Sequence, residues 1–109
     1  MGDWHSLIQL IRQFNQERDW SQFHNAKDLA LALSIEAGEL NELFLWKNAE
    51  EADTEKVKEE LADIFTYALQ LADKYGFDIN DIVTGKIQKN ALKYPVDKAK
   101  GSARKYDDL

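Results

Sequence analysis

The chain has 109 residues, with 14 Lys and Arg against 20 Asp and Glu, which gives a formal net charge of -6. This length gives room for one compact domain, and the negative charge argues against a nucleic-acid polymer or an anionic membrane as partner, because both call for a basic face. The absence of cysteine excludes disulfides, a thiolate zinc site and a cysteine nucleophile. No apolar run is long enough to span a membrane, and residues 1–4 do not open a signal peptide. We therefore expect a single soluble, cytoplasmic domain.

The spacing of apolar residues predicts an all-α fold of four helices without strands. The helices are expected, in chain order, over about residues 3–15, 26–46, 54–75 and 79–94. Asn25 and Asp78 are expected as N-caps. Residues 1–95 are expected to form the domain, and residues 96–109 a polar tail without periodicity.

Two residues of the third expected helix, Leu61 and Phe65, are expected to face inward with its other apolar residues. Phe65, Leu69 and Phe77 extend the apolar stripes further than one subunit can easily cover. Burial between subunits would remove that surface from water, so we expect a homo-oligomer.

Glu36 interrupts the apolar stripe of the second expected helix, because it falls between Leu33 and Leu40 on the same face. A lone carboxylate buried there would be costly or would become protonated, so Glu36 needs a cation beside it. Glu39 lies three residues further on, at the edge of the same face.

The third expected helix repeats this arrangement: Glu60 and Asp63 are three residues apart, and Tyr67 follows one turn later. If the two helices pack antiparallel, four carboxylates converge on one cleft, and their repulsion favours a hard divalent cation. Carboxylate oxygens suit Mg²⁺ or Mn²⁺ better than zinc. Because Mg²⁺ often completes its shell with substrate phosphates, the pattern predicts a phosphate-bearing substrate. The alternative is a solvated acidic face, which is common on helices.

Two further groups of residues are open to a structural or a binding interpretation. Trp20 and Trp46 lie near helix ends, where they could anchor the core or stack on a base. Lys86, Asn90 and Lys93 share one face of the fourth expected helix, which is either solvated or a clamp for phosphate or ribose. The sequence contains no glycine-rich phosphate loop.

The segments Glu36-Ala37-Gly38-Glu39-Leu40 and Glu59-Glu60-Leu61-Ala62-Asp63 resemble the ExxE…ExxD metal motif of the all-α nucleotide pyrophosphohydrolases, the MazG-like superfamily. Other segments resemble its dCTP pyrophosphatase branch, namely residues 17–20, 23–24, 45–47, 63–67, 90, 93–95 and 102–109. The resemblance covers nearly the whole chain.

The resemblance implies a MazG-like helical bundle that assembles into dimers or dimers of dimers, with sites completed across subunits. It implies hydrolysis of nucleoside triphosphates, dCTP or related dNTPs, to the monophosphate and pyrophosphate, as in cleansing of the nucleotide pool. The Mg²⁺ ligands it implies are Glu36, Glu39, Glu60 and Asp63. The nucleoside-pocket residues it implies are Trp20, His24, Trp46 and Tyr67, and the phosphate-side residues are Lys86, Asn90 and Lys93. No general base is identified.

Two departures from the branch concern base selectivity. Ile11 stands where the vertebrate dCTP enzymes carry a histidine, and residues 47–53 replace a longer loop. Both departures speak against strict selectivity for cytosine.

Other functions remain as alternatives. A dUTP-type or phosphoribosyl-ATP-type pyrophosphohydrolase is disfavoured by the pair Trp20 and Trp46 and by residues 93–95. A non-catalytic acidic dimerisation module is disfavoured by the position of Glu36 inside an apolar stripe.

Residues 98–106 offer four basic side chains, and we expect this tail to cover a nucleotide site, either that of its own subunit or that of a neighbouring subunit.

Overall fold

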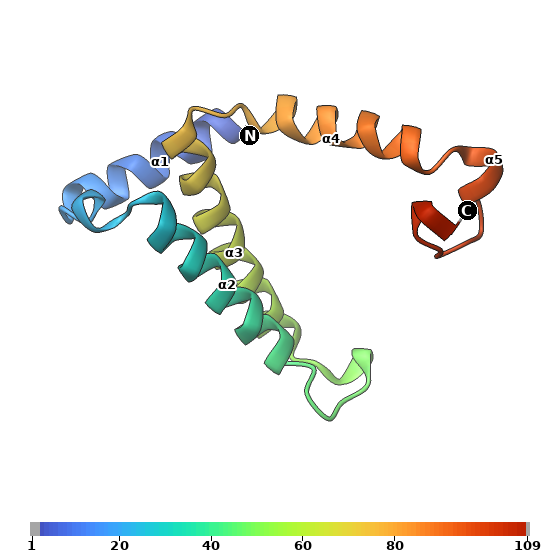
Figure 1. Ribbon diagram of the computed structural model, residues 1–109. Coiled ribbons are helices and arrows are strands. Elements are labelled where there is room, and N and C mark those ends of the chain that lie inside the picture. The colour runs from blue at the N-terminus through green and yellow to red at the C-terminus, as the bar shows by residue number, and fades with distance from the viewer. Residues whose placement is uncertain (1–2, 109) are drawn as a thin grey trace. The chain divides into compact units, whose positions relative to one another are not determined.

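The computed structural model describes residues 3–108, which contain helices and no strand, so the expected all-α class is confirmed (Figure 1). The α-helices are α1 (Trp4–Glu17), α2 (Ala26–Glu42), α3 (Thr54–Tyr75), α4 (Ile79–Lys93) and α5 (Val96–Ala99). Three 3₁₀ turns are η1 (Ser21–Phe23), η2 (Ala49–Glu51) and η3 (Tyr106–Asp108). Met1, Gly2 and Leu109, at the ends of the expected domain and tail, lie outside the described residues.

The chain divides into two compact units, Met1–Gly76 and Phe77–Leu109. The first unit holds α1, α2 and α3, and the second holds α4 and α5. The boundary follows Gly76, which ends α3 in the left-handed conformation with φ of 70°. Glycine suits this position, because a side chain would make that backbone conformation costly.

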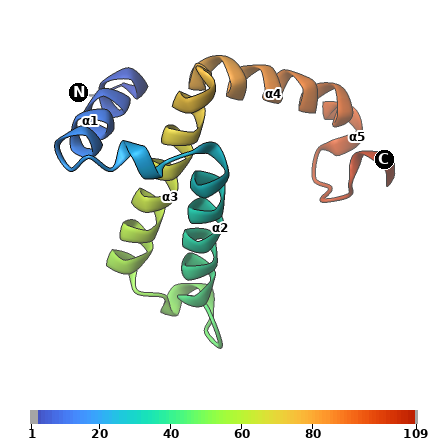
Figure 2. The ribbon, with the colours of Figure 1, turned by 60° about the vertical axis from the view of Figure 1, so that its left-hand side comes forward.

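In the first unit, α2 and α3 run antiparallel and pack side by side, as Figures 1 and 2 both show. Helix α1 packs against α3, and the guanidinium of Arg12 on α1 forms a salt bridge with the carboxylate of Asp73 on α3. Among the described residues, the buried apolar side chains are Leu29, Leu69 and Ala72, of which only Leu29 is fully buried. The core of one subunit is therefore small.

Side-chain caps set where the four long helices begin. The carboxylate of Asp3 accepts a hydrogen bond from the Ser6 amide, and that of Asp53 accepts from the amides of Glu55 and Lys56. The two predicted N-caps are confirmed: Asn25 accepts from the Asp28 amide and Asp78 from the Asp81 amide. Each cap satisfies a backbone donor that the first helical turn would leave without a partner.

The second helix ends at Glu42, so the prediction that it continues to Trp46 is wrong. Residues 43–46 form successive turns, and Trp46 takes the left-handed conformation with φ of 61°. The physical reason is that the chain must reverse here for α3 to run antiparallel to α2. The expected tail also differs from a simple coil, because it contains α5 and η3.

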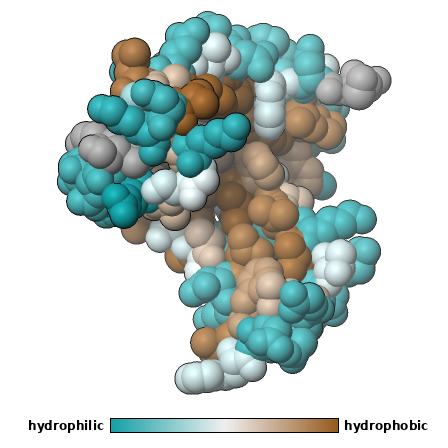
Figure 3. All heavy atoms as spheres, turned by 90° about the vertical axis from the view of Figure 1, so that its right-hand side faces the viewer, coloured by the Kyte–Doolittle hydropathy of each residue, from teal (hydrophilic) through white to brown (hydrophobic). Residues whose placement is uncertain are grey.

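Leu61 and Phe65 are not buried as expected, since 40% of Leu61 and 51% of Phe65 remain exposed. Leu61, Phe65, Leu69 and Ala72 follow one face of α3 at helical spacing, and only its C-terminal part, at Leu69 and Ala72, is buried. Leu69, which was expected to extend the exposed stripe, is instead part of the core. Apolar side chains consequently gather on the surface of the α2–α3 pair, the lower limb in Figure 3.

None of the helices in residues 3–108 combines the length and the apolar character that crossing a membrane would require.

Candidate functional site

Three carboxylates converge where α2 packs on α3: Glu36 from α2 and Glu60 and Asp63 from α3 each place an oxygen within 4.8 Å of the others. The antiparallel pairing of the helices produces this arrangement, because it sets the middle of α2 beside the first half of α3. Glu36 and Glu60 are half-buried and Asp63 is exposed. Four carboxylates from these two helices were expected to converge, and three of them do.

The electrostatics of this group call for a cation. Glu36 Oε2 and Glu60 Oε2 are buried and have no hydrogen-bond partner in the described part of the chain. The neighbouring Glu60 carboxyl, together with burial and the nearby Glu39, raises the pKa of Glu36 to about 7. Hard oxygen donors without counter-charges suit a divalent cation, which would satisfy both orphaned oxygens and remove the repulsion. The residues thus fit a divalent metal ion.

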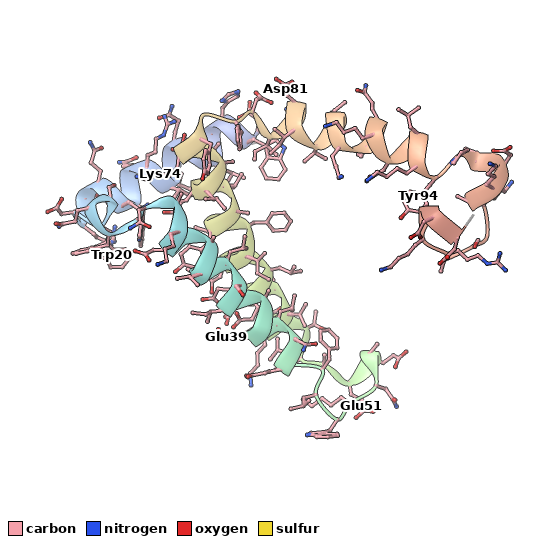
Figure 4. All side chains as sticks on the ribbon, in the orientation of Figure 1. Trp20, Glu39, Glu51, Lys74, Asp81 and Tyr94 are labelled. Carbon is pink, nitrogen blue, oxygen red and sulfur yellow. The ribbon has the colours of Figure 1, made fainter. Side chains whose placement is uncertain are left out.

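Glu39, the fourth predicted ligand, lies one turn further along α2 and is exposed (Figure 4). It lies outside the group of three carboxylates whose oxygens converge. Its charge still acts on that group, because it contributes to the raised pKa of Glu36.

A cavity of about 460 Å³ adjoins the carboxylates, and Asp63 lies in its wall. The other lining residues come from α1, from the two residues that flank η1, and from α3; they are Leu10, Ile11, Phe14, Asn15, Trp20, His24, Thr66, Tyr67 and Gln70. The structure therefore brings together three of the predicted pocket residues, Trp20, His24 and Tyr67. Because Asp63 belongs to both, the cavity and the acidic group form one site.

Trp20 is held at the cavity by the turn that follows α1 (Figure 4). Asp19 turns the backbone with φ of 53°, and the Trp20 amide donates to the Asn15 carbonyl at 2.9 Å. The Trp20 ring meets the Phe14 ring edge-on, with centroids 5.6 Å apart, and the Arg18 guanidinium lies 3.7 Å from the Phe14 ring centre. This stack fixes an indole that is still 45% exposed and so accessible to a flat ligand.

His24 also contributes to the cavity wall. Its Nδ1 is buried and has no hydrogen-bond partner within the described residues. A buried ring nitrogen without a partner is costly, so this atom is suited to a ligand group or an ordered water.

A pair of amide side chains in the same wall was missed by sequence reasoning. Asn15 is only 7% exposed, and its Nδ2 donates to Gln70 Oε1 at 2.7 Å. Gln70 Nε2 in turn donates to the Thr66 carbonyl at 3.3 Å. The sequence does contain a signal for Asn15, because this polar residue continues the line of Ile8 and Ile11 on the buried side of α1.

Trp46 and the three polar residues of the fourth helix are not brought into this cavity. Trp46 lies on the turn after α2 and is 94% exposed, so it does not anchor the core of its own chain. Lys86, Asn90 and Lys93 lie on α4, in the second unit, where Asn90 is half-buried and both lysines are exposed.

The chain is similar to proteins of known family. The model of the MazG-like family matches residues 31–109. The chain is 42% identical to dCTP pyrophosphatase 1 of Bos taurus and 38% identical to that of Homo sapiens, each time over 94% of its own length. It spans 66% of the bovine relative and 65% of the human one.

A solved structure is also similar, that of a pyrophosphatase from Archaeoglobus fulgidus. The TM-score is 0.78 and the sequence identity is 35%, with 84% of this chain and 91% of that chain covered.

Proposed function

Since the chain belongs to the MazG-like family, we propose that it hydrolyses nucleoside triphosphates, dCTP or related dNTPs, to the monophosphate and pyrophosphate. The names of its relatives, dCTP pyrophosphatase 1 and a pyrophosphatase, support this reaction class. The absence of cysteine fits the reducing cytoplasm, where we place the activity.

One observation carries the proposal: Asp63 is shared by the convergent carboxylates and by the wall of the cavity that Trp20 lines. A nucleotide whose base stacks on Trp20 would have its phosphates directed toward the acidic group. An acidic group without a cation would repel those phosphates. The carboxylates and the cavity can therefore bind one nucleotide only if a metal ion is present.

Glu36, Glu60 and Asp63 would hold this ion, and Glu39 would hold a second ion or support the first through its charge. We propose Mg²⁺, with Mn²⁺ as a substitute, because all the donors are carboxylate oxygens. When bound, the cation would neutralise the triphosphate and polarise the α-phosphate toward attack by water. The protein's own part is to hold the carboxylates in place through the packing of α2 on α3.

The nucleoside side of the site would be formed by Trp20, His24 and Tyr67. Trp20 offers a flat face for stacking, and His24 Nδ1 offers a buried polar atom in need of a partner. Lys86, Asn90 and Lys93 on α4 are proposed to contact phosphate or ribose, and the basic residues of 98–106 to cover a nucleotide site.

We also propose that the protein works as a homodimer or homotetramer. Support comes from the small core and from large apolar side chains that one subunit leaves exposed, such as Phe65 at 51%, Ile87 at 62% and Trp46 at 94%. In such an assembly we propose that Trp46, which lies outside the cavity of its own chain, reaches the nucleotide site of a neighbouring subunit.

Pyrophosphate release from the four standard dNTPs, with and without Mg²⁺, tests the function directly. We expect Mg²⁺-dependent release that Asp63→Asn abolishes, while the matched variant Glu59→Gln, an exposed carboxylate beside the motif, keeps it. Thermal melting should show stabilisation by Mg²⁺ in the wild type and not in Asp63→Asn. Release that persists in Asp63→Asn would contradict the proposed site, and no release from any dNTP would contradict the function.

A further inference from the structure

We infer that Asn15 reads the base: its Oδ1 accepts a hydrogen bond from an exocyclic amino group, so the site prefers cytosine to uracil. The inference rests on the proposed function, because it takes the cavity beside Asp63 as the nucleoside pocket. It concerns a residue that lies in the cavity wall together with Trp20 and Gln70.

The orientation of the Asn15 amide is determined by a chain of hydrogen bonds that ends on a backbone carbonyl. A carbonyl oxygen only accepts, so the Gln70 group that meets the Thr66 carbonyl at 3.3 Å must be its NH₂. The Gln70 oxygen is therefore the atom that faces Asn15, and Asn15 must meet it with its own NH₂, at 2.7 Å. Asn15 Oδ1 is therefore directed away from Gln70 and is the atom left to accept a hydrogen bond from another donor.

Helix α3 reinforces this chain at its anchored end. The Thr66 hydroxyl donates to the Ala62 carbonyl at 2.7 Å, which ties its own side chain to the helix rather than to Gln70. Gln70 thus lies between a helical backbone that cannot change polarity and a buried Asn15. Neither amide can flip without placing oxygen against oxygen or NH₂ against NH₂.

A fixed acceptor distinguishes the two pyrimidines. Cytosine carries an amino donor at the position where uracil carries a carbonyl acceptor. A freely rotating Asn side chain could serve either base by flipping, whereas an Asn locked with its oxygen outward pairs only with the amino group. Two acceptors facing each other repel, so uracil would lose the hydrogen bond that cytosine makes.

The position of Asn15 suits a base that stacks on Trp20. The Trp20 amide donates to the Asn15 carbonyl at 2.9 Å, so the two residues are connected through the backbone at the end of α1. Both line the same cavity as Asp63. A base lying on the indole would therefore present its edge to this part of the wall.

The test compares dCMP with dUMP in binding, by calorimetry of the full chain with Mg²⁺, and dCTP with dUTP in kcat/KM for pyrophosphate release. We expect both ratios to favour the cytosine nucleotide by about tenfold or more, the range for one buried hydrogen bond replaced by a mismatch. Ratios near one, with active enzyme, would overturn the inference and leave the proposed function standing. Preferential dCMP binding without any dNTP hydrolysis would support the inference and contradict the function.

Two variants of Gln70 separate base reading from packing. Gln70→Met keeps the side-chain volume but frees Asn15 to flip, so both ratios should fall toward one. Gln70→Glu keeps an acceptor toward Asn15 Nδ2 and should preserve the preference, although it introduces a charge. A role in packing alone predicts the reverse order, with Met tolerated and Glu harmful, and that result would overturn the inference.

Asn15→Leu supplies a further check that does not depend on Gln70. It removes the acceptor, so dCMP should lose its advantage over dUMP while the remaining affinity reports Trp20 stacking. Circular dichroism should show the same helix content as the wild type for every variant compared. A folded Asn15→Leu protein that keeps the full preference would overturn the inference.

Discussion

Glu36 on α2 and Glu60 on α3 meet across the helix pair, and each keeps one carboxylate oxygen buried without a hydrogen-bond partner in the described chain. Helix packing forces the two charges together, since both residues lie where α2 contacts α3. Without a cation, this contact between two carboxylates destabilises the fold.

Glu36→Gln should therefore raise stability and remove activity at once. It eliminates one of the two facing charges, and we expect the metal-free variant to melt about 4 °C or more above the metal-free wild type, the shift that about 1 kcal/mol gives in a domain of this size. Pyrophosphate release should fall by more than about a hundredfold, because a ligand is lost. Thermal melting in EDTA and a release assay measure both effects. Glu59→Gln, which alters an exposed carboxylate, should change neither.

The raised pKa of Glu36 predicts how the metal-free protein responds to pH. Its pKa is about 7 in the folded state against an ordinary value of 4.5, so the folded state holds the proton more tightly than the unfolded state does. This contribution to stability is fully present below about pH 4.5 and is lost as the pH rises through about 7. Melting temperatures in EDTA should accordingly fall between pH 5 and 8.

Glu36→Gln should flatten that pH profile, and the increase in melting temperature caused by Mg²⁺ should grow over the same range, because the metal binds the deprotonated carboxylates. A metal-free wild type whose melting temperature rises with pH in the same way as the variant's would contradict this assignment.

Trp20→Ala should weaken nucleotide binding by roughly 1–3 kcal/mol, the range for stacking of a base on an aromatic ring. Quenching of tryptophan fluorescence by a non-hydrolysable dCTP analogue measures binding, and most of the quenching should disappear in the variant. Phe14→Leu is a companion change, because it removes the edge-on ring contact but leaves the indole. It should raise the Michaelis constant by less than Trp20→Ala does. Unchanged binding in Trp20→Ala would exclude stacking at this position.

Phe65→Glu should weaken self-association without unfolding the subunit, because 51% of Phe65 is exposed on α3. Sedimentation velocity should show a shift toward the monomer at micromolar concentration. Lys56→Glu, an exposed change on the same helix, serves as the control and should leave the oligomer intact. A Phe65→Glu protein that sediments as the wild type does would place the subunit contact on another surface.

The helices were predictable where residues with strong local preferences begin or end them. Asn25 and Asp78 cap their helices as expected, and Gly76 ends α3. The end of α2 was not predictable, because the apolar pattern continues through Leu43 to Trp46 without a glycine or proline. The reversal of the chain depends on tertiary packing, and that information is not present in local spacing.

The acidic half of the site was predictable because a carboxylate inside an apolar stripe stands out, and Glu36 is half-buried as its position indicates. Asn15 is likewise a polar residue on the apolar side of α1. It was not predicted as a site residue because its partner, Gln70, lies 55 residues away. Amide pairs of this kind have no sequence spacing that identifies them, since only the packing of α1 on α3 brings them together. The exposure of Leu61 was not predictable from periodicity, whereas Phe65 was expected to extend the apolar stripe beyond what one subunit can cover.

The connection between α2 and α3 stabilises itself. The Asn48 amide donates to Glu51 Oε1 at 3.2 Å, the Glu51 amide donates to the Asn48 carbonyl at 3.0 Å, and Asp53 caps α3. Each of these hydrogen bonds joins residues only two or three positions apart, so it does not depend on the length of the connection as a whole. Lengthening a surface loop also costs little entropy. Evolution or an engineer could therefore enlarge this hairpin, or attach a reporter to it, without moving the carboxylates that the two helices hold.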